Sequence, residues 1–79
     1  MWEIKITLDE STTGVGTISG TWTDEDGVFS FSARSTVDEA GQTEFIVLAS
    51  VARDAWKAKL ATEKVLADAA TAKANEGVT

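Results

Sequence analysis

The chain has 79 residues and a net charge of −6, with 43% hydrophobic and 25% charged residues. This composition predicts a single small globular domain spanning residues 1–79 rather than a disordered segment. The chain contains no cysteine and no histidine. Disulfides, thiolate metal sites and histidine-activated nucleophiles are therefore excluded. The net negative charge argues against direct binding to nucleic acid, which attracts basic surfaces.

No apolar run approaches the roughly 20 residues that a helix needs to cross a bilayer. The first ten residues also lack the basic and apolar regions of a signal peptide. We therefore expect a soluble, intracellular protein without a membrane partner.

Three segments in the first half have the period-2 pattern of strands. Apolar and polar residues alternate over residues 2–8, and the same alternation recurs over residues 15–23 and 28–34. The connections are short, which favours an antiparallel meander with the same face buried on all three strands.

The second half changes to a helical period. Thr36 and Glu39 have the spacing of a capping box, which predicts a helix from residue 37. Gly41 follows closely, so a start at residue 42 is the alternative, and in both cases the helix should run to residue 76. The fold class is then α+β, a three-stranded antiparallel meander packed on one long C-terminal helix. The predicted apolar face of the helix comprises Phe45, Leu48, Ala49, Ala52, Ala55, Trp56, Leu60, Leu66, Ala67, Ala70 and Ala74.

This helix is too long for the predicted sheet. Its length is roughly 50 Å, whereas strands of this size span about 23–30 Å. The second half of the helix carries mostly alanine, which permits close approach of another helix. We expect it to pack against a second copy of the protein, and a frayed end or a break near Glu63 is the alternative. The predicted interface residues are Leu60, Glu63, Leu66, Ala67, Ala70 and Ala74.

Glu63 interrupts the apolar face. It either marks where that face leaves the core or is paired, with Lys59 one turn earlier or with a lysine of a partner.

Acidic residues are concentrated in the front half. Residues 1–50 contain nine acids and two bases, a balance of −7. The trio Asp24–Asp26 fails the ligand spacing of a calcium loop. With Gly27 it is typical of a hairpin connection, a type I turn followed by a glycine bulge. Its residues could instead join the loop acids in one acidic patch. That patch would comprise Asp9, Glu10, Asp24, Glu25 and Asp26.

No residue pattern indicates a catalytic, cofactor-binding or metal site. The serines and threonines lack an activating base, and nearly all the front-half acids fall in predicted turns or near the helix start. The three tryptophans could line a ligand pocket, but their positions favour the core. We expect no enzyme activity, no cofactor and no small-molecule substrate.

Residues 16–56 include a strand containing Trp22, the acid–glycine turn, the segment FSFSAR and a helix with ARDAW. In these features the chain resembles the short uncharacterised proteins of tailed bacteriophages. The resemblance implies a virion or host-cytoplasm location but no catalytic residues.

Two functions follow as expectations. The first is a small interaction or assembly protein that forms a homo-oligomer, or binds another phage or host protein, through the helix. In a phage it would be a structural component of the particle. The second is an acidic inhibitor that occupies the basic groove of a host nucleic-acid-binding protein.

Overall fold

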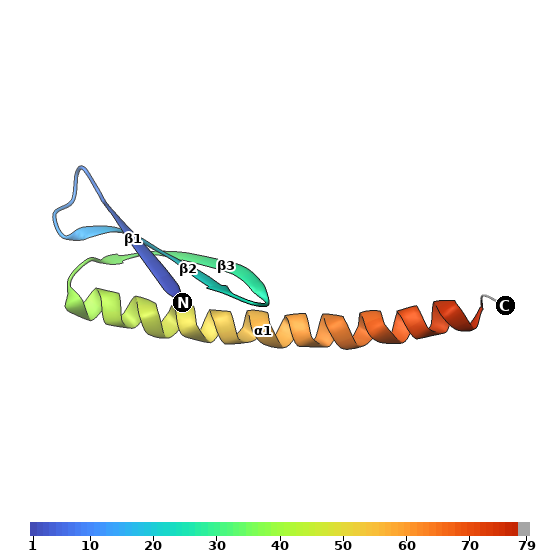
Figure 1. The fold of residues 1–79 in the computed structure, drawn as a ribbon. Coiled ribbons are helices and arrows are strands. Elements are labelled where there is room, and N and C mark those ends of the chain that lie inside the picture. Colours follow the sequence, from blue (N-terminus) through green and yellow to red (C-terminus); the bar gives the residue numbers. More distant parts are fainter. Residues whose placement is uncertain (78–79) are drawn as a thin grey trace.

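The computed structural model describes residues 1–77 and confirms the α+β architecture (Figure 1). Three strands, β1 (Trp2–Leu8), β2 (Val15–Asp24) and β3 (Gly27–Thr36), are followed by one helix, α1 (Glu39–Glu76). The sheet is antiparallel with strand order β1-β2-β3. α1 lies along one face of the sheet, over β3 and β2.

The β2–β3 hairpin is tighter than the sequence suggests. Asp24 pairs with Gly27, so Glu25 and Asp26 form a two-residue connection, and the register continues without an inserted bulge. Gly27 has a φ of 133°, a conformation that other residues rarely adopt. The connection is therefore a turn, as predicted, but without the predicted bulge. Trp22 lies opposite Phe29, as the strand phases require.

The core lies where β2 meets the first turns of α1. Ile18, Phe45 and Ala49 are almost fully buried, and Phe31 packs beside Phe45 with ring centroids 5.7 Å apart. Gly20 makes this packing possible. A Cβ on Gly20 would come within 3.2 Å of the Phe45 ring and of two side chains of β1. The glycines in the inner phase of β2 thus leave room for large neighbours.

α1 begins at Glu39, between the two predicted starting points. Its N-cap is Asp38, whose Oδ1 accepts hydrogen bonds from the Gly41 backbone N–H at 2.9 Å and from the Thr36 hydroxyl at 3.0 Å. The predicted capping by Thr36 is therefore wrong, because the threonine hydroxyl supports the cap instead of forming it. Gly41 is buried in the first turn, close to the Thr36 backbone, where a larger residue would collide.

The expectation that the same face is buried on all three strands is wrong for β1. Ile4, Ile6 and Leu8 remain 41%, 39% and 61% exposed. A helix is about 10 Å wide and neighbouring strands are about 4.8 Å apart. One helix therefore covers two strands, and here these are β2 and β3. Leu48 was also expected in the core, but it is 49% exposed.

α1 is continuous through Glu63 and extends far beyond the sheet (Figure 1). The described molecule measures 67 × 20 × 16 Å, and α1 determines the longest dimension. The last helical side chain that is partly buried is Leu60. No helix within residues 1–77 is long and apolar enough to cross a membrane.

Candidate functional site

The part of α1 that extends past the sheet is the main candidate site. We call residues 61–76 the overhang; every one of them is exposed. At 1.5 Å per residue the overhang is about 24 Å long. Its large apolar side chains are Val65 and Leu66, which are 68% and 64% exposed. The overhang therefore presents its side chains to a partner or to water, and not to its own sheet.

One face of the overhang carries the residues predicted as an interface. Glu63, Ala67, Ala70 and Ala74 follow one another at intervals of three or four residues, so they form a single stripe. Leu66 flanks this stripe. Leu60, about one turn before the stripe, is partly buried. Glu63 lies 3.7 Å from Lys59 in an exposed i,i+4 ion pair, one of the two pairings expected for it.

The β2–β3 turn is attached to α1 where the overhang begins. Lys57 Nζ lies 2.5 Å from Asp24 Oδ2 and 2.9 Å from Asp26 Oδ2. Trp22 Nε1 donates to the same Asp24 carboxylate at 2.7 Å, and the Asp26 backbone N–H donates to its other oxygen at 2.8 Å. Asp24 thus accepts from the helix, from its own strand and from the turn.

These contacts stabilise the charged forms of both partners. Hydrogen bonds from Lys57 and Trp22 hold the pKa of the Asp24 carboxyl well below its ordinary value of 3.8. The bonds to Asp24 and Asp26 raise the pKa of Lys57. At the N-terminus of α1, the Gly41 backbone N–H and the Thr36 hydroxyl lower the pKa of Asp38. Carboxylates held in the charged form act as anchors for bases and backbone amides rather than as proton donors.

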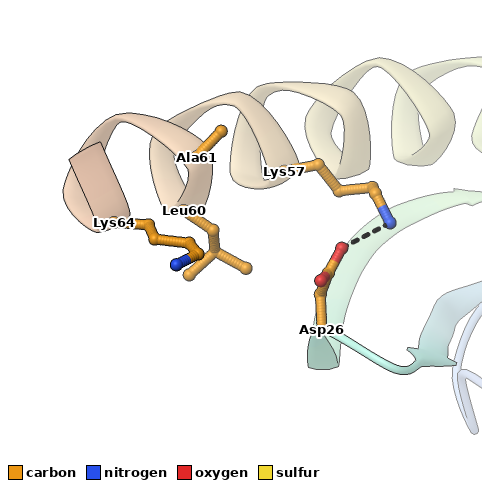
Figure 2. A pocket seen from close by; sticks show the side chains of 5 residues that line it. All are labelled: Asp26, Lys57, Leu60, Ala61 and Lys64. Atoms are coloured by element: carbon orange, nitrogen blue, oxygen red, sulfur yellow. Dashed lines mark ion pairs between the residues drawn. The ribbon is translucent and has the colours of Figure 1, made fainter. Parts of the chain in front are cut away.

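A shallow pocket of about 290 Å³ lies next to this attachment (Figure 2). Its walls are Asp26 from the turn and Lys57, Leu60, Ala61 and Lys64 from α1. All three of its charged groups already have partners, because Lys57 binds Asp26 and Lys64 lies 3.2 Å from Asp68. The pocket is the space left where the helix passes the tip of the hairpin.

Arg53 joins α1 to the tryptophans of the sheet. Its guanidinium lies 4.4 Å from the Trp22 ring centroid and 5.7 Å from that of Trp2. The two indoles meet edge to face at 5.4 Å. Trp56 stacks on Phe29 at 5.5 Å. The tryptophans therefore contact aromatic and cationic side chains of the protein itself. All three are only partly buried, so they lie at the margin of the core and not within it as expected.

The five residues of the possible acidic patch do not come together. Asp9 and Glu10 follow β1, whereas Asp24, Glu25 and Asp26 lie at the opposite end of β2, about 30 Å away for a strand of this length. Each group is also partly neutralised, since Asp9 forms a bidentate ion pair with Arg34 and Lys57 binds the other group. The acidic inhibitor function thus has no contiguous surface to act through.

Two helical bases in this region, Arg53 and Lys57, do not stand out in the sequence as site residues. They lie four residues apart on the flank of α1 that faces Trp22 and Asp24. One feature of the sequence does indicate that helical bases could meet the acidic turn. The turn follows Trp22, which is on the face of β2 that the helix covers, so the turn is expected to lie near the helix. The sequence does not show which helical turn would pass it.

Comparison of the chain with protein-family models, curated proteins and solved structures finds no match. Within residues 1–77, no group of three or more acidic side chains is placed to hold a metal ion.

Proposed function

We propose that the chain is a small non-enzymatic interaction protein that self-associates through the stripe on its overhang. The observation that carries this proposal is a continuous helical extension of about 24 Å whose side chains are all exposed. An amphipathic helix normally gains its stability by packing one face. Here the half of α1 that packs on the sheet nucleates the helix, and the alanine stripe is available to pack against a partner.

A second copy fits this stripe in an antiparallel arrangement. With the two-fold axis near Asp68, Leu66 of one copy lies opposite Ala70 of the other, which sets a large side chain against a small one. The same arrangement sets Glu63 opposite Lys73, so the carboxylate within the stripe gains a second basic neighbour. Small residues let the two helix axes approach closely, which favours dispersion contacts along the stripe.

The resemblance to short tailed-bacteriophage proteins suggests a phage particle as the setting. A component of such an assembly needs contact surfaces rather than a catalytic cleft. The observed carboxylate anchors are compatible with this role, because they fix the direction in which the overhang projects.

Light scattering over a range of concentrations tests the proposal. The mass of the wild-type chain should rise with concentration into the high micromolar range. Ala70→Glu introduces a charge into the stripe and should shift the part of this rise that the stripe mediates to at least about tenfold higher concentration. Ala72→Glu is the matched control, because Ala72 lies on the opposite side of the same helical turns and should behave as wild type.

A strict monomer at high micromolar concentration, with the helix content of α1 intact by circular dichroism, contradicts the proposal. Equal effects of Ala70→Glu and Ala72→Glu would also contradict it, since the stripe would then have no special role.

A further inference from the structure

The open edge of the sheet formed by β1 is a second surface without a partner in residues 1–77. Met1 and Thr23 exchange two backbone hydrogen bonds, and the Asp9 N–H donates to the Val15 carbonyl. Hydrogen-bonded pairs alternate along an antiparallel ladder, so the odd-numbered residues of β1 bond to β2. The backbone groups of Trp2, Ile4, Ile6 and Leu8 therefore point outward from the sheet.

The same four residues carry the apolar face of β1. Ile4, Ile6 and Leu8 are two-fifths to three-fifths exposed, because α1 lies over the other two strands. β3 is also an edge, but the aromatic residues of its inner face are covered: Phe29 stacks on Trp56, and Phe31 packs on Phe45. An edge that combines free backbone groups with an uncovered apolar face is a template for another strand.

The charges on the outer face of β1 indicate which strand fits. Glu3 and Lys5 are exposed neighbours in one phase, and neither forms an ion pair with another residue of the described chain. A lone lysine on an edge strand discourages pairing. Glu3 and Lys5 together do not discourage pairing with a second copy. In an antiparallel pair of β1 strands, Glu3 of each copy can lie opposite Lys5 of the other.

We propose that β1 pairs with β1 of a second copy, antiparallel, around a two-fold axis at Ile4, to form a continuous six-stranded sheet. In this register Ile4 faces Ile4 of the second copy, and Trp2 faces Ile6, through their outward backbone groups. Glu3 then lies opposite Lys5 twice, as a non-hydrogen-bonded pair in which side chains are closest. Moving the axis to Lys5 would set two lysines against each other, and moving it to Glu3 would oppose two glutamates.

The dyad is perpendicular to the sheet, so both helices lie on the same face and run antiparallel. Each helix covers β2 and β3 of its own copy, and the two are roughly 20 Å apart by strand spacing. They therefore do not collide. The surface shares no residue with the stripe on the overhang, so either self-association can fail without the other.

Single cysteines test the register, because the chain contains none of its own. In Ile4→Cys the two Cα atoms would lie about 5.5 Å apart, a separation that a disulfide spans. In Ile6→Cys they would be separated by about 13 Å along the strands. Ile4 and Ile6 are equally exposed, which makes them a matched pair.

We expect mild oxidation to yield a disulfide-linked dimer of Ile4→Cys and monomer for Ile6→Cys. A folded Ile4→Cys chain, by circular dichroism, that stays monomeric after oxidation overturns the proposal. Equal cross-linking of both variants overturns it too, because the register would then be undefined.

Charge exchange provides a second test, carried out in the Ala70→Glu background so that the stripe does not contribute to the mass. Glu3→Lys or Lys5→Glu alone sets like charges opposite each other and should weaken dimerisation roughly tenfold. The double variant restores opposite charges and should dimerise as tightly as its parent. A mixture of the two single variants should form a heterodimer. Wild-type affinity in the single variants, or no recovery in the double variant, overturns the proposal.

Discussion

Lys57 on α1 and Asp24 at the end of β2 are 33 residues apart in the chain, yet their charged atoms lie 2.5 Å from each other. This pair attaches the tip of the hairpin to the helix at the point where the sheet ends. It therefore joins the two parts of the fold at the base of the overhang. Because both pKa values shift toward the charged forms, the pair makes stability depend on pH.

The first prediction concerns acid. The pKa of Asp24 is lower in the folded chain than the ordinary 3.8, so its stabilising contribution is present above that pH and is lost as the pH falls toward the folded value. Lys57→Met should therefore lower the midpoint of urea unfolding at pH 7, and the difference from wild type should shrink toward pH 2. Lys64→Met removes an exposed pair on the overhang and should change the midpoint little at either pH. An undiminished difference at pH 2 would show that Lys57 acts through packing alone.

The second prediction concerns the core. Phe45 is 2% exposed and contacts Phe31. Phe45→Ala leaves a cavity and should cost about 3–5 kcal/mol in the free energy of unfolding. Because small domains have total stabilities of about 5–15 kcal/mol, this variant should be close to unfolding at room temperature. Val51→Ala, on the exposed side of the same helix, should change stability by less than about 0.5 kcal/mol. Guanidinium titration followed by tryptophan fluorescence measures both.

The third prediction contrasts two glycines in and after α1. Alanine normally stabilises a helix by about 1 kcal/mol relative to glycine. Gly41→Ala should nevertheless destabilise the chain, because its Cβ would overlap the Thr36 backbone. Gly77→Ala has the same chemistry, a φ of −79°, and no atom closer than 3.6 Å to the new Cβ. Thermal unfolding should therefore show a lower midpoint for the first variant and an unchanged or slightly higher one for the second. A rise for Gly41→Ala would mean that the first turn of α1 can move away from β3.

The fourth prediction concerns Arg53. Its guanidinium lies against the faces of Trp22 and Trp2, and such contacts contribute about 0.5–1 kcal/mol at partly exposed sites. Arg53→Met keeps much of the aliphatic stem but loses the cation, so it should reduce stability by about 1 kcal/mol and alter tryptophan emission. Arg53→Lys keeps the charge without the planar group and should lie between Arg53→Met and wild type. If Arg53→Met were as stable as wild type, the contact of the guanidinium with the two tryptophans would not contribute to stability.

Local patterns were sufficient to predict the elements of the fold. The alternation around Phe29 and Phe31 predicts β3, and the uninterrupted run to Glu76 predicts the end of α1. The cap could not be assigned, because Thr36 and Asp38 are both good capping residues and the choice depends on how the chain leaves β3. The exposure of Ile4 could not be predicted either. It follows from where one helix lies across three strands, which is a property of the packing and not of β1.

The candidate site likewise has features that the sequence predicts and features that only the packing determines. The stripe on the overhang follows from helix periodicity and from the ratio of helix length to strand length, both of which can be read from the order of residues in the sequence. The separation of Asp9 from Asp24 already follows from the predicted meander. Consecutive connections of antiparallel strands lie at opposite ends of the strand between them. The contacts of Lys57 and Arg53 depend on where the helix crosses the sheet, which the sequence alone does not specify.

The overhang also has a mechanical consequence. α1 is attached to the sheet along its first half, and its second half is a rigid lever. A tilt of about 10° at Leu60 would move the far end, about 24 Å away, by roughly 4 Å. A change in the stacking of Trp56 on Phe29 that tilted α1 by this angle would displace Ala74 by a similar distance. Substitutions deep in the sheet can therefore redirect what the end of the helix meets, without touching any residue there.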